Sequence, residues 1–506
     1  MLSKISDHRP GIAKSYFLQE RCQLMSFRLS PYPVVGMLVL MLIAMAASTV
    51  RADFFQDRSH LINNNGPRLS YGIAVADLDG NNAPEFIVTG FGHPNLALAF
   101  SDGRLSNSIS DGLFSDPERK TIGVAACDVD GDGMEEVYFL NTDAYSGEKV
   151  LADRLLDFSR SPIDLFEQGD NWVSLNLTAG RSVACVDRNG DGQYGIYVSN
   201  YGGPSRFYEV EGTQIEDISI QLGIDRTTGG RAVVSGHILG SRNDIFAANE
   251  RGPNFLYQNI DGGFLDKAVE YGVDDTLQNG RGTALADIMY SGRLGIIIGN
   301  WNGYHRAYVP MQDSFLDFAT DEFREPSLVR TVISADFDND GYDEIFFNNI
   351  GQPNRMFRVR DGGVIEPVPL SAALEADGLG TGAAVADIDN DGVLDLLVAH
   401  GESAPQPLSL FRADIKNPGR YLRIAPLTRN GAPARGATVI LETDMRVHAK
   451  TIDAGSGYLC QMEPVAHFGL RKDEVIRSVS VRWTDGTEDE LGEVTINTVH
   501  TIRKDE

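Results

Sequence analysis

The stretch DVDGDGMEE, residues 128–136, decides the fold, because it returns along the chain at a nearly fixed interval. It recurs as DFDNDGYDE at 336–344 and DIDNDGVLD at 387–395, with variants DLDGNNAPE at 77–85 and DRNGDGQYG at 187–195. Oxygen-bearing side chains stand mostly at positions 1, 3, 5 and 9, and glycine usually stands at position 6, where the chain must turn sharply. This donor set suits a hard divalent cation, above all Ca²⁺.

The spacing of these loops sets the number of structural units. The gap from 187 to 336 is three times the usual interval and holds two degenerate copies. One places Gly236 at position 1 and Asp244 at position 9, and the other places Asp287 and Gly295 there. The seven starting positions are then 51, 59, 49, 51, 49 and 51 residues apart. A constant period of this length is typical of repeat architectures such as propellers.

Alternating apolar runs flank each loop, for example IGVAACD before and VYFLN after the loop at 128. This period-2 pattern predicts strands, and four short strands in about 50 residues make one propeller blade. The sequence therefore predicts an all-β fold, with a seven-bladed β-propeller over residues 53–413 and a small C-terminal β-domain over 416–503. The segment FFQD at 54–57 resembles the last strand of a repeat. We expect it to complete the last blade and close the ring, which would remove exposed sheet edges.

An EF-hand is the competing interpretation of an acidic loop with a central glycine. It requires a bidentate Glu at position 12 and a helix on either side. Position 12 is Phe139 after Asp128 and Phe347 after Asp336, and the flanking runs have strand periodicity. The sequence therefore excludes an EF-hand.

The loops differ in the metal ligands that they offer. Three loops have four carboxylates each: Asp128, Asp130, Asp132 and Glu136; Asp336, Asp338, Asp340 and Glu344; Asp387, Asp389, Asp391 and Asp395. The loop at 77 offers Asp77, Asp79, Asn81 and Glu85, with Asn82 in place of the turn glycine. The loop at 187 offers Asp187, Asn189 and Asp191, but Gly195 replaces the last acid, so it either binds weakly or only shapes the hairpin.

Acidic turns also occur without metal, since Asp, Asn and Gly favour turns. Repetition of the whole donor set, and the repulsion among four carboxylates in one loop, favour the metal interpretation. We therefore expect three to five structural Ca²⁺ sites, each stabilising a hairpin within a blade. The copies at 236 and 287 lack most ligands, and we expect packing alone to hold them.

The chain carries a net charge of −27 over 506 residues. Such a charge disfavours a nucleic-acid partner and suits cation binding or solubility. An apolar run at 34–47 follows Arg28, and Val50 and Ala52 provide small residues before a cleavage point. We expect residues 1–52 to form a signal peptide with an over-long start; an uncleaved anchor is the alternative. Secretion, without a stable membrane span after cleavage, follows from this expectation.

Three cysteines follow residue 52. Cys127 and Cys185 occupy nearly equivalent positions in adjacent repeats, one and two residues before the first loop aspartate. They are either a disulfide between neighbouring inner strands, which secretion would permit, or two small buried residues near the propeller axis. Cys460 has no evident partner, and no Cys/His spacing indicates zinc.

The repeat stops near Lys416, and shorter β-type runs follow. Together with the acidic loops, the run at 431–443, GSGY at 455–458, HFGL at 467–470 and VRWTDG at 481–486 resemble FG-GAP or VCBS repeats joined to an ASPIC/UnbV domain. From 53 to 500 the chain is similar to the cartilage acidic protein 1 family. The resemblance implies a secreted, acidic, Ca²⁺-binding protein, with matrix members in animals and relatives in microbes. Some animal members carry an EGF-like module that the given sequence does not show, so we do not expect functions tied to it.

Chemistry-bearing residues outside the loops are few. His400, Glu402 and Ser403 could imitate an active-site cluster but are more typical of a turn, and His467 is more typical of packing than of metal binding. Trp301 either stacks on carbohydrate or packs between blades. Asn176 begins a glycosylation sequon, NLT. We therefore expect an extracellular binding or adhesion module whose partner is a protein or glycan. A glycan-acting lyase or hydrolase, and a Ca²⁺ buffer, are the alternatives.

Overall fold

Antiparallel sheets follow one another along the chain in this computed structural model, which describes residues 54–505. The helices in these residues are short: α2 (Gly112–Ser115), α3 (Ala268–Tyr271) and α4 (Asp321–Arg324), with 3₁₀ turns at Ser59–Leu61, Leu165–Glu167, Asn171–Ser174, Asp361–Gly363 and Ala372–Leu374. The predicted all-β propeller class is confirmed. The expected signal peptide lies outside the described residues.

The strands from residue 55 to 413 form five four-stranded sheets and one eight-stranded sheet, in which β11 (Gly195–Pro204) of one four-stranded unit pairs with β14 (Thr227–Gly236) of the next. Seven four-stranded units result, most of them in sequential order. They are β2 (Ser70–Ala76), β3 (Glu85–Gly90), β4 (Leu96–Ser101), β5 (Arg104–Asn107); β6 (Thr121–Cys127), β7 (Glu136–Asn141), β8 (Arg154–Asp157), β9 (Ile163–Asp164); β10 (Gly180–Val186), β11 (Gly195–Pro204), β12 (Arg206–Glu211), β13 (Gln214–Asp217); β14 (Thr227–Gly236), β15 (Asp244–Asn249), β16 (Phe255–Ile260), β17 (Gly263–Asp266); β18 (Gly280–Ala286), β19 (Gly295–Asn300), β20 (Arg306–Pro310), β21 (Phe315–Asp317); β22 (Val329–Ala335), β23 (Glu344–Asn349), β24 (Arg355–Arg360), β25 (Val364–Pro367); and β26 (Gly380–Ala386), β27 (Asp395–His400), β28 (Ser409–Ala413), β1 (Phe55–Asp57).

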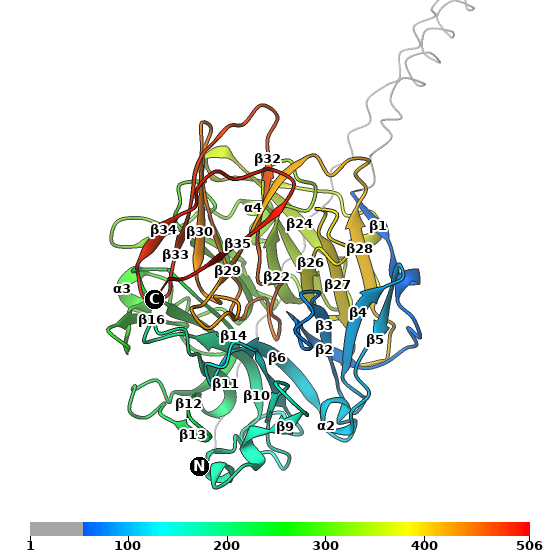
Figure 1. Cartoon of the computed structure of the whole chain (residues 1–506), viewed down its shortest axis with the longest axis vertical. Coiled ribbons are helices and arrows are strands. Elements are labelled where there is room, and N and C mark those ends of the chain that lie inside the picture. The colour runs from blue at the N-terminus through cyan, green and yellow to red at the C-terminus, as the bar shows by residue number, and fades with distance from the viewer. Residues whose placement is uncertain (1–53, 506) are drawn as a thin grey trace, which may run out of the picture. The chain divides into compact units, whose positions relative to one another are not determined.

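The ring closes through the N-terminal strand. β1 pairs antiparallel with β28, with Phe55 opposite Ala413, and Figure 1 shows the blue β1 beside the yellow-orange β28. This confirms that FFQD completes the last blade. The first strand of each unit contacts the first strand of the next, and β2 contacts β26, so these seven inner strands surround a central channel. Apolar side chains such as Phe346 and Leu396 fill the space between blades.

Two loops differ from the expectation. In the regular loops the residue before position 1 pairs with position 9, as Cys127 does with Glu136. Gly236 itself pairs with Asp244, so this copy is one residue shorter and Gly236 belongs to the strand.

The two degenerate hairpins are also not held by packing alone. Asp244 accepts hydrogen bonds from Leu239 N at 2.7 Å and Asn259 N at 2.8 Å, because a carboxylate can satisfy turn amides.

The C-terminal segment forms two further sheets. One contains β32 (Ala466–Leu470), β29 (Arg420–Leu427) and β35 (Val499–Arg503); the other contains β31 (Val447–Thr451), β30 (Thr438–Thr443), β33 (Ile476–Arg482) and β34 (Glu488–Glu490). Leu422, Val439, Phe468 and Trp483 are buried between them. Nevertheless, residues 54–505 belong to one compact unit, so this segment is closely joined to the propeller. Within the described residues no helix has the length and apolar character to cross a membrane.

Candidate metal centres

The acidic loops owe their shape to their first aspartate. In the loop at 128, Asp128 accepts hydrogen bonds from Gly131 N at 2.7 Å and Gly133 N at 3.0 Å. Gly133 has a φ of 95°, in the left-handed region that favours glycine. Asn82, which replaces glycine in the loop at 77, adopts a φ of 62°, so asparagine supports the same turn there.

Three loops bring carboxylates close enough to share a metal ion. The groups are Asp128, Asp130 and Glu136; Asp336, Asp338 and Glu344; and Asp387, Asp389 and Asp391, with ligand atoms in each group within 4.8 Å of one another. Asp132, Asp340 and Asp395 lie outside these groups. The loops at 77 and 187 do not form such a group in residues 54–505.

The residues in these clusters fit a cation, because each cluster leaves buried carboxylate oxygen without a hydrogen-bond partner. These atoms are Glu136 Oε1, Asp336 Oδ1, and both Asp389 Oδ1 and Asp395 Oδ2 in the loop at 387. A buried, unsatisfied anionic oxygen is costly unless a positive charge compensates it. Burial raises the pKa of Asp128 to about 7 and that of Glu136 to about 10, and nearby Asp130 adds to both effects.

Arginines distinguish two of the clusters from the third. Arg358 on β24 lies opposite Glu344 and pairs with Asp338, Glu344 and, at 2.9 Å, Asp340. Arg412 on β28 takes the equivalent position and pairs with Asp389 at 2.9 Å and with Asp391. The ion pairs in residues 54–505 include none to Asp128, Asp130, Asp132 or Glu136. The loop at 128 therefore has the greatest need of an external cation.

The first aspartates of the loops at 77 and 187 also accept hydrogen bonds from turn amides, and that of the loop at 187 has a further partner. Asp77 accepts hydrogen bonds from Asn81 N at 3.1 Å and Asn82 N at 2.7 Å, and burial raises the pKa of Glu85 to about 7. Asp187 accepts hydrogen bonds from Gly190 N at 2.7 Å and from the hydroxyl of Thr484 at 2.5 Å. A partner from the C-terminal segment thus supports the hairpin at 187, and Asn189 and Asp191 stay candidate ligands only.

The C-terminal sheets cover the face of the propeller that carries these loops. Position 8 of the loop at 128 is Glu135, which pairs with the fully buried Arg435 at 2.7 Å. Arg423 pairs with Asp387 at 2.8 Å, and Lys450 pairs with Asp343, position 8 of the loop at 336, at 2.6 Å. His237 and Asp287 of the degenerate loops bond Thr438 and Ala449. Six of the seven loops therefore contact the C-terminal segment.

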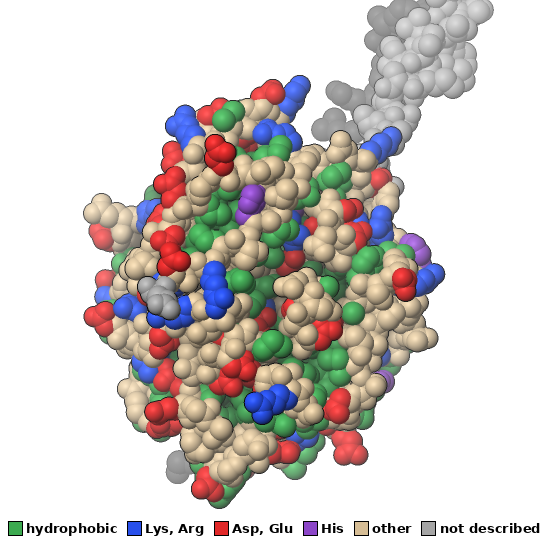
Figure 2. Space-filling view, viewed as in Figure 1, with side chains coloured by type: hydrophobic (Ala, Val, Ile, Leu, Met, Phe, Trp, Pro, Cys, Tyr) green, Lys and Arg blue, Asp and Glu red, His purple; other side chains and the backbone are tan. Residues whose placement is uncertain are grey.

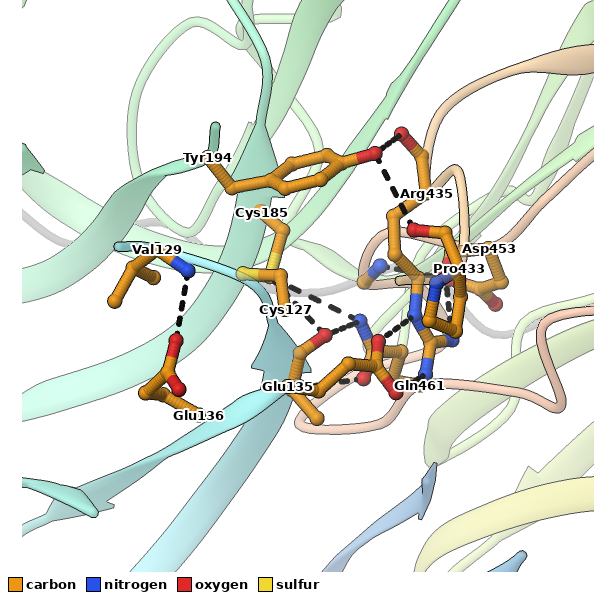
Figure 3. Close-up of a disulfide and its surroundings, with 12 residues drawn as sticks. Cys127, Val129, Glu135, Glu136, Cys185, Tyr194, Pro433, Arg435, Asp453 and Gln461 are labelled. Atoms are coloured by element: carbon orange, nitrogen blue, oxygen red, sulfur yellow. Dashed lines mark hydrogen bonds and ion pairs between the residues drawn. A yellow bond between two sulfur atoms is a disulfide. The ribbon is translucent and has the colours of Figure 1, made fainter. Parts of the chain in front are cut away.

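A disulfide joins the first two of these covered blades. Cys127 and Cys185 are bonded, with Cα atoms 6.2 Å apart, which resolves the alternative left open by the sequence. Figure 3 shows Gln461 beside them. The Gln461 side chain donates to Ala126 O at 3.0 Å and accepts from Ala126 N at 2.8 Å. In the same view Arg435 lies between Glu135 and Asp453, whose carbonyl oxygen it reaches at 2.9 Å. Cys460 is a buried free thiol.

Residues 453–463, the channel segment, pass through the middle of the ring. They bond inner strands of five blades: Cys185 N to Ala454 O, Thr283 N to Gly457 O, Val124 N to Leu459 O, Val75 N to Gln461 O, and Glu463 N to Val385 O. GSGY at 455–458 contributed to the family resemblance, but it gave no indication that this stretch enters the propeller. The sequence likewise gave no indication that Arg358, Arg412 and Arg435 pair with carboxylates of the acidic loops.

The remaining singled-out residues have structural partners. His400 bonds Pro407 O at 2.8 Å and Glu375 at 3.3 Å, and His467 bonds Asn339 at 2.6 Å. Asn176 is fully buried and donates to Asp153 at 2.7 Å, so the folded chain does not expose the sequon for glycosylation. Trp301 contacts two arginines. The centre of its ring lies 4.7 Å from Cζ of Arg281 and 4.6 Å from Cζ of Arg330.

Comparisons with known proteins agree with the two parts of the fold. Residues 427–506 match the family model described as ASPIC and UnbV, and residues 336–398 match an FG-GAP-like repeat. Cartilage acidic protein 1 from Homo sapiens is 47% identical over 464 residues, covering 84% of this chain and 70% of the human protein. The protein of that name from Mus musculus is 46% identical, covering 84% of this chain and 72% of the mouse protein.

The similarities to solved structures are weaker. YCF48 from Cyanidioschyzon merolae has a TM-score of 0.44 at 13% identity and covers 71% of this chain and 98% of its own. A structure of BBS1N in complex with ARL6DN has a TM-score of 0.45 at 11% identity and covers 72% of this chain and 99% of its own.

Proposed function

The chain belongs to the cartilage acidic protein 1 family, and from this membership we propose that it is a secreted, calcium-stabilised propeller that acts as an extracellular binding module. Residues 53–413 would be the propeller domain and 416–503 the domain that covers its loops. The observation that carries the calcium assignment is the buried carboxylate oxygen without a hydrogen-bond partner in each of three equivalent loops. Ca²⁺ prefers such oxygen ligands.

The role of the metal in this proposal is structural. Asp128, Asp130 and Glu136 would hold one ion, Asp336, Asp338 and Glu344 a second, and Asp387, Asp389 and Asp391 a third. The ion would neutralise carboxylates that otherwise repel one another within a hairpin. Because Glu135 and Asp343 of these loops contact Arg435 and Lys450, ordered loops would also keep the C-terminal sheets in place.

Binding, and not catalysis, is the second part of the proposal. The residues that most resembled a catalytic cluster have other partners, since His400 bonds Glu375 and Glu402 pairs with Arg330. Names of the relatives do not describe an enzyme. A screen for turnover of matrix and cell-wall glycans tests this part, and turnover removed by one substitution outside the metal loops would contradict it.

Calorimetric titration of Ca²⁺ into protein stripped of metal tests the calcium assignment. We expect binding at several sites, and the variant Asp130→Asn with Asp132→Asn should lose one of them, because the loop at 128 then keeps too few charged ligands. Asp102→Asn, the same change in an exposed hairpin turn, is the matched control and should lose none. An unchanged number of sites in the loop variant would contradict the assignment.

A further inference from the structure

A ring of arginines lines the propeller channel at the end opposite the metal loops. Arg181, Arg231, Arg281 and Arg330, here called the arginine ring, come from four consecutive inner strands, β10, β14, β18 and β22. Arg181, Arg281 and Arg330 are the second residues of their strands, and Arg231 is the fifth residue of the longer β14, whereas the metal loops follow the carboxyl ends. The ring therefore lies on the face that the C-terminal sheets leave uncovered.

A β-bulge places each of these side chains. The strand register shifts between Gly180 and Ser182, between Gly230 and Val233, between Gly280 and Gly282, and between Val329 and Thr331. An arginine occupies each shift, and a bulge turns a side chain away from its regular direction. Tyr71 and Ile122 occupy the equivalent shifts in β2 and β6. All six side chains line one cavity of about 520 Å³.

The cavity has a positive lining in a protein with a strongly negative charge. Its basic residues are Lys120, Arg181, Arg231, Arg251, Arg281 and Arg330, against three acidic residues, Asp143, Glu250 and Glu402. Glu250 accepts from Arg231 at 2.8 Å and from Arg281 at 3.1 Å, and Glu402 pairs with Arg330. The Arg281 and Arg330 side chains are each more than nine-tenths buried. Each donates to a carboxylate through Nη2, whereas the hydrogen bonds within residues 54–505 include none from either Nη1, and neither Nη1 is sealed from the cavity. These two Nη1 atoms are the donors available to an anion.

Aromatic rings hold the guanidinium groups in place. Trp301 lies against both Arg281 and Arg330, and Tyr201 lies 4.3 Å from Arg231. Stacked arginines lose little freedom when they bind a carboxylate or sulfate with two parallel hydrogen bonds. Trp301, Tyr145 and Phe91 also line the cavity, so a ring-shaped ligand would meet flat apolar surfaces beside the charges.

Tyr458, from the channel segment, also lines the cavity and reports its potential. Burial alone would raise the pKa of this phenol, but Arg231, Arg281, Arg181 and Arg330 lower it to about 8. The site therefore stabilises the negatively charged phenolate of Tyr458 near pH 8, where a tyrosine ordinarily stays neutral.

We infer that this cavity binds a small ligand with a carboxylate or sulfate group on a sugar-sized ring, with the anion at Arg281 and Arg330 and the ring near Trp301. The volume lies within the range of pockets that bind small molecules. The inference rests on the proposed role as a binding module and names the class of its ligand.

The test titrates the Ca²⁺-loaded full chain with sodium glucuronate, glucose 6-sulfate, inorganic sulfate and neutral glucose at constant ionic strength. We expect the two anionic sugars to bind more tightly than glucose and inorganic sulfate. In Arg281→Gln with Arg330→Gln their affinity should fall by roughly tenfold or more, since charge-assisted hydrogen bonds are lost. Arg160→Gln, an exposed arginine outside the cavity, is the matched control and should bind normally.

Fluorescence provides a readout that does not depend on the arginine variant folding. Anionic sugar should change the emission of the unmodified chain, and Trp301→Phe should remove that change while Trp172→Phe keeps it. Binding of glucose as tight as glucuronate, an unaltered affinity in a folded arginine variant, or preference for inorganic sulfate alone would overturn the inference. Calcium binding is measured in a separate titration, so a negative result for the anionic sugars would leave the calcium assignment intact.

Discussion

At the scale of single residues, the repeat shows which polar groups the fold requires. Asn95, Asn254 and Asn354 occupy equivalent places, and each accepts a hydrogen bond from the backbone amide five residues earlier, at 2.8, 2.9 and 2.8 Å. His305 takes this place in the fifth unit, where its Nδ1 accepts from Asn300 N at 3.0 Å. Of these four side chains only the histidine can titrate near neutral pH, so this position is sensitive to acid in the fifth unit and not in the other three.

His305→Asn should therefore reduce acid sensitivity. Burial, with a smaller effect of Arg355, lowers the pKa of His305 to about 3. The unfolded chain binds a proton below about pH 6.5 and the folded chain does not, so stability is lost as pH falls below 6.5. At about pH 5 the loss from this residue is about 2 kcal/mol. Urea unfolding at neutral and acid pH measures it, and an equal acid loss in variant and wild type would contradict the explanation.

A second residue-scale prediction concerns the arginine within the loop at 336. Arg358→Gln removes a positive charge that competes with Ca²⁺ for Asp338 and Glu344. We expect the Ca²⁺ affinity of this loop to rise by roughly tenfold or more, given the Coulomb energy of close charges. Calorimetry should use a background with Asp130→Asn and Asp389→Asn, which weakens the other two clusters. Arg355→Gln on the same strand is the control; a weaker site in Arg358→Gln would show that the arginine supports the loop.

At the scale of elements, links between blades matter more than individual strands. Local hairpins form each blade, but neighbouring blades meet mainly through side chains, as with Ala126 and Val137 beside Ala74 and Ile87. The Cys127–Cys185 disulfide is a covalent link of this kind, between β6 and β10, and it closes a segment of 58 residues.

Replacing both cysteines by alanine should destabilise the protein by roughly 2–4 kcal/mol, because the unfolded chain regains the freedom that the crosslink removes. Chemical unfolding with and without reductant measures this difference. Reductant should lower the stability of the wild type and leave that of the double variant unchanged. Equal stability of the oxidised wild type and the double variant would contradict the expected contribution.

At the scale of the whole molecule, the metal loops and the C-terminal segment form one unit. Six loops contact that segment, and the channel segment bonds five inner strands. Acidic side chains are spread over the face in Figure 2 and are mixed with basic ones, so the net charge of −27 is distributed and does not form one patch there. Because these loops contact the C-terminal segment, loss of metal should weaken the packing of that segment on the propeller as well as the individual hairpins.

Chelation should lower the melting temperature and loosen the C-terminal sheets. At about 1 mM free Ca²⁺ and the affinities usual for extracellular modules, each site contributes roughly 0.4–1.4 kcal/mol. The three proposed sites together correspond to a fall of roughly 1–4 °C for a chain of this length. Calorimetry measures the fall, and limited proteolysis should cut near the exposed turn at 429–430 sooner with EDTA. A melting temperature unaffected by EDTA would contradict the structural role of the metal.

The sequence by itself determined the repeated unit, because its signals act over a few residues. Strand alternation, a turn glycine such as Gly133 and the carboxylates of one loop lie within the same hairpin, so their spacing specifies their geometry. It also identified β1 as the strand that completes the last blade. The sequence did not predict the shorter loop after Gly236, because one deleted residue changes the pairing register without changing the apolar pattern.

Only the tertiary structure decided which distant residues meet. Arg435 lies 300 residues after Glu135, and Gln461 reaches β6 from the far end of the chain. The arginines of the ring follow Gly or Val within the inner strands, but that they share one cavity depends on the circular arrangement of the blades and on bulges that turn the side chains inward. Local propensity cannot encode such contacts, since they form only when the closed ring brings its inner strands around one axis.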